Sequence, residues 1–310
     1  MNKVISNSIS GWVFNEIDRK DAICGNKIIN PSIDLSNACN LNCKYCYSEN
    51  IESERKVVYD DELTFREIIK IIDAFAKAGS KSINIVGSGE PTIYPFFKEV
   101  VKKISERNII PVVFTNGVII SSNYQLVEFL YKNNVSIVIK YNSSNSDIQD
   151  LLVGRTGYSI KRDKALECLI DFGFNSYNPT RLGFDVIVFN EVIDEIPGIL
   201  RYCRRNNIFP IIADYIPSGR TYNGVVADAN NGNCLVDMLG NKSGVKLMPP
   251  TNDQKYVLYN ELKRIDEVEF GILHDEFPAY YSGIPCTQML GLYVDIHGDI
   301  WPCVAKGGGD

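Results

Sequence analysis

Apolar positions along the chain follow two alternating patterns, one typical of helices and one typical of buried strands. Between 61 and 78, Ile68, Ile72 and Phe75 recur at the spacing of one helical face. Residues 82–86 form a short run rich in β-branched residues, which has the length and composition of a buried strand. The same contrast predicts strands at 32–36, 82–86, 109–114, 135–141, 182–189 and 210–215. It predicts helices between them at 61–78, 96–104, 124–131, 161–172 and 193–204.

This alternation over 31–220 predicts an α/β fold on a parallel sheet with right-handed crossovers. Active sites of such folds form at the carboxyl ends of the strands. The Gly-, Asn- and Asp-rich stretch 218–250 has no predicted element, whereas 252–265 is predicted to be a helix. Residues 280–303 are predicted to form a small β-rich appendage, because two alternating segments flank a turn at 297–298.

Composition and charge narrow the classes of function. The 310 residues suit one large domain, or one with a small appendage, and a hydrophobic content of 45% is enough for a sizeable core. A formal net charge of −6 argues against a nucleic-acid partner, which leaves a basic footprint. The first ten residues lack the apolar centre of a signal peptide, and no run approaches the ~18 apolar residues of a membrane span. Nine cysteines in such a chain favour the cytoplasm, and only two histidines, His274 and His297, argue against histidine chemistry.

Three cysteines stand close together at Cys39, Cys43 and Cys46, with Tyr45 directly before the third. Thiolates grouped in this way hold soft metal centres. Structural zinc is one alternative, but it normally has four protein ligands, and no fourth Cys or His lies nearby. Disulfides are another alternative, and they are typical of short secreted chains. Three thiolates on a [4Fe–4S] cluster leave one iron open, and the spacing favours such a cluster.

This C-x3-C-x-aromatic-C stretch resembles that of the radical S-adenosylmethionine (SAM) enzymes, with Tyr45 at the aromatic position. The resemblance implies a [4Fe–4S] cluster on Cys39, Cys43 and Cys46, with SAM bound to its open iron. It implies that an external flavodoxin- or ferredoxin-like donor supplies an electron that cleaves SAM. The resulting 5′-deoxyadenosyl radical would abstract a hydrogen atom from a peptide or small-molecule substrate. The resemblance also implies that the six βα units form an open, partial (β/α)6 TIM-like barrel.

The predicted barrel divides the chain into an N-terminal segment at 1–30, the barrel at 31–220, and a connecting segment with the extension at 221–310. Some peptide-modifying relatives carry a recognition wing before the barrel. The N-terminal segment is too short for such a wing, because a small independent domain needs about 55 residues. Together with the acidic net charge, this leaves peptide and small-molecule substrates open.

The second predicted strand is followed directly by Gly87, Ser88, Gly89, Glu90 and Pro91. A dinucleotide fingerprint needs a third glycine, but Thr92 stands at that position. The stretch resembles the G-G-E-P motif of the radical SAM family, with Ser88 replacing the second glycine. The resemblance implies that backbone here meets the SAM ammonium and that Glu90 shapes the contact, since small residues let backbone approach a ligand closely. A plain strand-to-helix turn is the alternative.

Polar residues also follow the third and fourth predicted strands. Asn116 resembles a family position near SAM, although a simple Asn-Gly turn explains it as well. Lys140 ends an apolar strand, where an ammonium must reach solvent or an anion. The resemblance implies that Lys140, Asn142 or Ser143 contacts the ribose or carboxylate of SAM. Arg155 is either a bidentate partner of the SAM carboxylate or a solvated loop cation.

Two residues are weaker candidates for catalysis. Asp185 shares a strand face with Gly183 and Ile187, and it meets substrate or SAM if that face lines the barrel. An internal salt bridge is the alternative, because a buried charge must be paired. Arg220 lies in a Pro-x-Gly-Arg stretch that resembles one common in this branch of the family, and it either contacts substrate or closes the barrel.

The last cysteines define a further candidate site. Cys286 and Cys303 stand in a C-x11-G-x4-C pattern, which resembles the first half of the SPASM/Twitch extension. The resemblance implies an auxiliary [4Fe–4S] cluster as a second cofactor, with Cys234 as a spare candidate ligand. Cys168 and Cys203 lie on apolar helical faces and are interpreted as buried hydrophobes.

Two other classes of protein stay open on these patterns. A non-enzymatic iron–sulfur electron carrier needs no adenosyl pocket, and the stretch 87–91 and Lys140 therefore argue against it. A zinc-stabilised α/β binding module would differ from the radical SAM enzyme and from the electron carrier because it would contain no iron.

Overall fold

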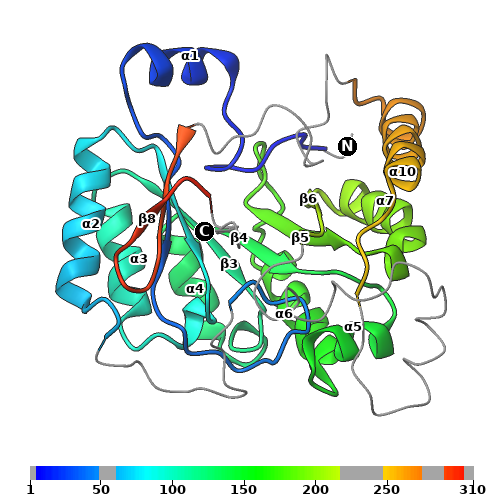
Figure 1. The fold of residues 1–310 in the computed structure, drawn as a ribbon, viewed down its shortest axis with the longest axis horizontal. Coiled ribbons are helices and arrows are strands. Elements are labelled where there is room, and N and C mark those ends of the chain that lie inside the picture. Colours follow the sequence, from blue (N-terminus) through cyan, green and yellow to red (C-terminus); the bar gives the residue numbers. More distant parts are fainter. Residues whose placement is uncertain (1–4, 49–60, 217–246, 274–289, 304–310) are drawn as a thin grey trace.

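In the part of the chain that the structure describes, eight strands form a single sheet in the order β6-β5-β4-β3-β2-β1-β7-β8 (Figure 1). This computed structural model describes residues 5–48, 61–216, 247–273 and 290–303. All neighbouring strands run parallel except β7 and β8, which form an antiparallel pair. The strands are β1 (Ser32–Asp34), β2 (Ser82–Val86), β3 (Ile110–Thr115), β4 (Ser136–Lys140), β5 (Leu182–Val188), β6 (Phe209–Asp214), β7 (Tyr293–Val294) and β8 (Ile300–Trp301).

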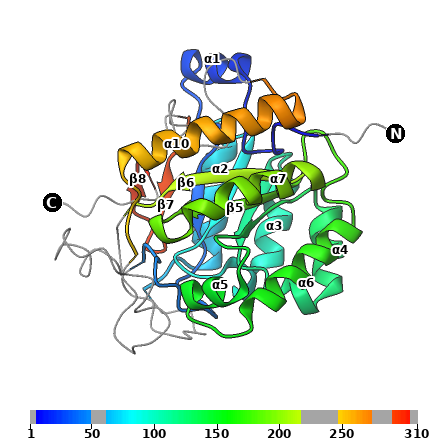
Figure 2. The same cartoon turned by 90° about the vertical axis from the view of Figure 1, so that its right-hand side faces the viewer.

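Helices cover the outer face of this sheet, and α10 packs along α7 at one end of it (Figures 1 and 2). Their apolar faces and the strands form one large core of aliphatic and aromatic side chains. The helices are α1 (Glu16–Cys24), α2 (Phe65–Lys77), α3 (Phe97–Ser105), α4 (Tyr124–Lys132), α5 (Ser146–Val153), α6 (Tyr158–Asp171), α7 (Ile196–Asn206) and α10 (Asn252–Arg264). None of these described helices is long and apolar enough to cross a lipid bilayer.

The α/β fold class predicted from the sequence is confirmed, with the six parallel strands in their predicted order along the chain. The predicted helix at 61–78 begins later, at Phe65, because Thr64 forms a capping box with Glu67 and thereby fixes the first turn. Two of the described helices were missed. α1 has only one buried residue, and α5 spans eight residues, so neither carries a long apolar stripe.

The C-terminal hairpin extends the barrel sheet. β7 pairs in parallel with β1, so that Tyr293 lies beside Ser32 and Val294 beside Ile33. The predicted β-hairpin is therefore present, and it covers the edge of the first barrel strand. Side chains of β7 are thereby brought next to the loop that carries the three cysteines.

Residues 6–12, here called the N-terminal plug, lie across the amino ends of the strands (Figure 1, top). Ile9 forms a parallel bridge with Thr180, just before β5. The Ser136 hydroxyl, at the start of β4, donates a hydrogen bond of 2.7 Å to the carbonyl of Ser10. These contacts close the end of the barrel opposite to the cysteines.

Gly11 is the residue that allows the plug to enter the barrel so closely. Its φ of +81° lies in the left-handed region, and a Cβ there would stand 2.9 Å from methyl groups of Ile110 and Val112. The Asn30 side chain donates a hydrogen bond of 3.0 Å to the Gly11 carbonyl. Only glycine meets both the backbone and the packing requirement at this position.

Candidate active site

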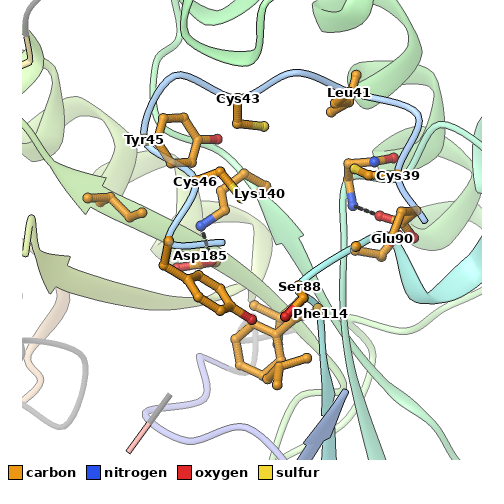
Figure 3. A pocket seen from close by; sticks show the side chains of 18 of the residues that line it. Cys39, Leu41, Cys43, Tyr45, Cys46, Ser88, Glu90, Phe114, Lys140 and Asp185 are labelled. Atoms are coloured by element: carbon orange, nitrogen blue, oxygen red, sulfur yellow. Dashed lines mark hydrogen bonds and ion pairs between the residues drawn. The ribbon is translucent and has the colours of Figure 1, made fainter. Parts of the chain in front are cut away.

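A cavity of about 370 Å³ opens at the carboxyl ends of the strands, beneath the cysteine loop (Figure 3). Eleven residues singled out from the sequence line it together: Cys39, Cys43, Tyr45, Cys46, Gly87, Ser88, Gly89, Glu90, Asn116, Lys140 and Asp185. Five others of the described candidates do not line it: Pro91, Asn142, Ser143, Arg155 and Cys303. Arg220, Cys234 and Cys286 lie outside the described residues.

The cysteine loop is held from one side by the end of α5. The backbone N–H groups of Asn42 and Lys44 donate hydrogen bonds to the carbonyls of Val153 and Leu152, at 3.0 and 2.8 Å. Gly154 caps α5 with a φ of +66°, and a Cβ on it would stand 2.6 Å from the Asn42 carbonyl oxygen. The missed helix α5 is therefore one support of the predicted metal loop.

Arg155 and Asn116 hold the same loop by their side chains. Nη1 of Arg155 donates a hydrogen bond of 2.7 Å to the carbonyl of Asn40. Nδ2 of Asn116 donates to Oδ1 of Asn40, also at 2.7 Å. Arg155 is thus engaged with the residue that follows Cys39, while Asn116 both holds the loop and faces the cavity.

The three cysteines all face the cavity as thiols (Figure 3). Cys39 is 8% exposed, and burial raises the pKa of its thiol to about 12. Across the described ranges, no three His, Cys, Asp or Glu side chains approach closely enough to hold a single metal ion. The thiols line the cavity from the cysteine loop instead, with no other Cys and no His among its described lining residues. This all-sulfur set fits a larger centre ligated by thiolates, as iron–sulfur clusters are.

The turn 87–91 packs against the cysteine loop by backbone contact. The N–H of Glu90 donates a hydrogen bond of 2.7 Å to the carbonyl of Ala38. A Cβ on Gly89 would stand 2.1 Å from that same carbonyl oxygen and 2.7 Å from the one of Ser36. Glycine at 89 therefore lets the second strand's turn lie directly beneath the residues that precede Cys39.

Glu90 joins this turn to the end of β3. Its buried carboxylate accepts hydrogen bonds from the N–H of Asn116 at 2.8 Å and the hydroxyl of Thr115 at 2.6 Å. It also accepts from the N–H and the hydroxyl of Thr92, at 3.1 and 2.5 Å. Burial raises the pKa of Glu90, and these hydrogen bonds oppose that shift.

Lys140 and Asp185 form an ion pair in the cavity wall, from neighbouring strands β4 and β5 (Figure 3). The ammonium of Lys140 also stands 5.4 Å from the centre of the Tyr45 ring. The predicted strand face of Asp185 does line the cavity, since Ile187 faces it as well. Asp185 therefore both forms a salt bridge and lines the cavity, two roles that were alternatives on the sequence alone.

Asn142 and Ser143 are fully buried behind this wall. Backbone N–H groups of both donate to Oε1 of Gln149, at 2.9 and 3.0 Å. The hydroxyl of Ser143 donates 2.7 Å to a carboxylate oxygen of Glu195, and Oδ1 of Asn142 accepts from the N–H of Ile187. Both predicted SAM contacts thus hold the end of β4 in place.

A buried polar group beside the cysteine loop was missed from the sequence. Asp34, at the end of β1, accepts hydrogen bonds from the N–H and hydroxyl of Ser88 at 3.1 and 2.5 Å, and from the Tyr293 hydroxyl at 2.5 Å. The sequence signal was a carboxylate at the end of a buried strand. Its partner Tyr293 could not be identified without the position of the C-terminal hairpin.

Other missed lining residues come from the plug and from β3 and β6. Trp12 faces Phe114 edge to face, with ring centres 5.1 Å apart. Asp214 lines the cavity at the end of β6, where its carboxylate lies 3.0 Å from Nζ of Lys255 on α10. The rule that strand ends carry sites could have found Asp214, whereas no local pattern marks Trp12.

The fold and the three thiols define the class of this protein. Residues 33–203 match the family profile described as "Radical SAM superfamily", which covers more than half of the chain. The chain belongs to that superfamily. It is a radical SAM enzyme, and the cofactors of the family are a [4Fe–4S] cluster and SAM.

Curated relatives divide among several reactions. The chain is 27% identical over 160 residues to "S-adenosylmethionine-dependent nucleotide dehydratase" of Flammeovirga pacifica. This alignment covers 49% of this chain and 53% of that protein. It is 25% identical over 195 residues to "Probable GTP 3',8-cyclase" of Methanococcus maripaludis, covering 62% of this chain and 61% of that one. It is 26% identical over 187 residues to "Mycofactocin maturase MftC" of Mycolicibacterium smegmatis, covering 60% and 44%. The chain therefore spans between 44% and 61% of the length of these relatives.

Two solved structures share the fold. Streptococcus suis SuiB bound to its precursor peptide SuiA has a TM-score of 0.64 at 17% sequence identity, covering 98% of this chain and 68% of that one. The protein anSMEcpe with bound AdoMet has a TM-score of 0.56 at 14% identity, covering 90% and 72%. The partial-barrel architecture implied by the cysteine motif is thus confirmed. The SPASM/Twitch cluster and the domain boundaries stay predictions.

Proposed function

We propose that Cys39, Cys43 and Cys46 hold the [4Fe–4S] cluster and that the turn 87–91 and Asn116 bind SAM beside it. When bound, this pair supplies a 5′-deoxyadenosyl radical by one-electron cleavage of SAM. The observation that carries the proposal is that the three thiols, the glycine turn and Asn116 line one cavity. If the cysteines bound a metal and the turn 87–91 served only to connect a strand to a helix, the two would not need to line the same cavity.

The residues around the cavity would position SAM and substrate and keep water away. Gly87 and Gly89 present backbone to the cavity, and Glu90 fixes their turn against β3. Lys140 offers donors to an anionic or polar ligand group, with Asp185 keeping its ammonium in place. Glu90 is buried, and Lys140 and Asp185 are only about a fifth exposed, which favours a site that excludes water and so protects a radical from solvent.

The substrate would lose a hydrogen atom to that radical, and it is either a peptide or a small molecule. Structural neighbours named for a bound peptide favour the first, while relatives named as nucleotide dehydratase or cyclase favour the second. An external flavodoxin- or ferredoxin-like donor would deliver the electron. Thiol ligands of this kind support work in the reducing cytoplasm.

The test is anaerobic reconstitution with iron and sulfide, followed by dithionite and SAM, and measurement of 5′-deoxyadenosine. We expect brown protein with four irons per chain and formation of 5′-deoxyadenosine. Eight irons would indicate an auxiliary cluster at Cys286 and Cys303. The Cys43→Ala variant should lose both the colour and the product, whereas Cys24→Ala, a change at an exposed thiol, should keep both.

An intact cluster that never yields 5′-deoxyadenosine would favour the electron-carrier alternative and overturn the proposal. Zinc without iron after expression in iron-rich medium would favour the binding module. Retained turnover in Cys43→Ala would contradict the assignment of the ligands.

A further inference from the structure

The end of the cavity farthest from the cysteines is apolar. Trp12 of the N-terminal plug enters it from the amino ends of the strands and packs edge to face on Phe114. Val138 and Ile211 line the cavity from β4 and β6. Because the plug closes the barrel here, Trp12 forms a floor, and a group that reaches this depth meets mainly aliphatic and aromatic carbon, with the hydroxyl-bearing Ser32 at the start of β1 also lining the cavity.

The charged groups of the described cavity lining are mostly carboxylates. Lys140 is the single cation among these described lining residues, which also include the carboxylates of Glu90, Asp185 and Asp214, the last of them paired with Lys255 of α10. Lys140 is itself paired with Asp185. Polyphosphate groups are normally bound by several Arg or Lys side chains or by helix N-termini. The described wall therefore opposes a nucleoside triphosphate.

The Lys140–Asp185 pair lies above the apolar floor, between it and the cysteine loop (Figure 3). It presents an ammonium donor next to a carboxylate acceptor, both about a fifth exposed, at 23% and 18%. A neutral amide carries one acceptor and one donor in the same arrangement. A group of this kind can meet both side chains without bringing a net charge into the cavity.

We propose that the substrate presents an apolar side chain to the Trp12 floor and a neutral amide to Lys140 and Asp185. This rests on the proposed function, in which the cysteine end of the cavity holds the cluster and SAM. The substrate class is then a peptide or acylated amino acid with a hydrophobic residue at the reacting position. Trp12 is the residue that sets the depth, and hence the size, of the accepted side chain.

The test uses Trp12 as its own reporter. The chain has two tryptophans, so Trp301→Phe leaves Trp12 alone. This variant, reconstituted and saturated with SAM but not reduced, is titrated with N-acetyl-L-leucinamide, N-acetyl-L-asparaginamide and GTP, and the emission of Trp12 is recorded. Leucine and asparagine side chains are similar in shape but differ in polarity. We expect saturable emission change with leucinamide at least about tenfold tighter than with asparaginamide, and none with GTP.

A matched pair of variants tests whether leucinamide binds at the apolar end of the cavity. In the same background, Val138→Thr adds a hydroxyl to the apolar wall and should weaken leucinamide binding about tenfold. Ile160→Thr makes a comparable change on the exposed face of α6 and should leave binding unchanged.

Three results would overturn the inference: no response to leucinamide, equal binding of asparaginamide, or saturable binding of GTP. A response of Trp12 to SAM alone that leucinamide competes away would also overturn it, by placing SAM on the floor. The titration needs no electron transfer or turnover. A protein that makes no 5′-deoxyadenosine can therefore still be titrated. The result of the binding test is thus independent of the result of the test for SAM cleavage.

Discussion

The hydroxyl of Tyr293 donates a hydrogen bond of 2.5 Å to Oδ2 of Asp34, although 259 positions separate the two residues. Asp34 in turn accepts from Ser88 of the turn 87–91. The C-terminal hairpin therefore does more than cover a sheet edge. It supplies a donor to the buried carboxylate that fixes the proposed SAM-binding turn.

Removing that donor should weaken both the edge of the sheet and the turn. Tyr293→Phe leaves a buried carboxylate with one hydrogen bond fewer, so we expect about 1–3 kcal/mol less free energy of unfolding by denaturant titration. Tyr256→Phe on α10, where the ring is 70% exposed, is the control and should change stability little. Equal stability of the two variants would mean that the hydrogen bond adds nothing.

Adding a methyl group at Gly89 should disturb the metal site. In Gly89→Ala, the new Cβ would stand 2.1 Å from the Ala38 carbonyl oxygen, so the loop before Cys39 must move. We expect less iron per chain after reconstitution and a lower thermal midpoint. Gly198→Ala in α7 is the matched control, because a Cβ there meets nothing within 4 Å. Full iron loading of Gly89→Ala would disprove the close packing of turn and loop.

The stability contributed by Glu90 should depend on pH. Burial raises the pKa of Glu90 in the folded protein, so the protonated form is favoured by folding. The associated stability is present below the unfolded-state pKa and is lost as pH rises through the folded-state pKa. We therefore expect the stability advantage of wild type over Glu90→Gln to shrink as pH rises above the ordinary glutamate range. Urea titrations of both proteins at several pH values measure it, and an advantage that grows with pH would contradict the assignment.

Cys39 should react slowly in protein that carries no cluster. Burial raises the pKa of its thiol to about 12, so little thiolate is present at neutral pH, and the thiolate is the reactive form. We expect alkylation by iodoacetamide, followed by peptide mass spectrometry, to be at least about tenfold slower at Cys39 than at the exposed Cys24. Similar rates would show that the loop opens readily. Cluster assembly must release the Cys39 proton, so it should also lower the pH of an unbuffered sample.

The Lys140–Asp185 pair should show coupling in a double-mutant cycle. Lys140→Met leaves the Asp185 carboxylate without its ammonium, and Asp185→Asn leaves the ammonium without its carboxylate. We expect each change to cost about 1–3 kcal/mol, with the double variant less destabilised than the sum of the two. Denaturant unfolding of the four proteins measures the coupling. Strict additivity would mean that the two side chains act independently.

The order of elements could be predicted because buried parallel strands leave a strong local trace. Runs such as 82–86 and 182–188 are short, rich in β-branched residues and mostly buried, and the helices between the strands carry a regular apolar stripe. The three cysteines and the turn 87–91 were likewise found from local spacing. Their meeting in one cavity follows from the rule that strand ends share one edge of the sheet.

What escaped prediction depends on contacts between distant residues. Trp12 reaches Phe114, and Tyr293 reaches Asp34, without any local pattern that indicates either pairing. Helix α5 escaped because its eight residues are too few for a clear period. Arg155, a candidate ligand of the SAM carboxylate, is instead seen bonded to the loop carbonyl of Asn40.

The N-terminal plug has a consequence for how the chain folds. The N–H of Ser6 donates to Oδ1 of Asn207 at 2.7 Å across 201 positions, so this contact needs the turn between α7 and β6 to be in place. Contacts between residues this far apart in sequence raise the contact order, and we expect them to form late in folding. We expect the strands to assemble first with their amino ends uncovered, and residues 6–12 to pack across those ends last.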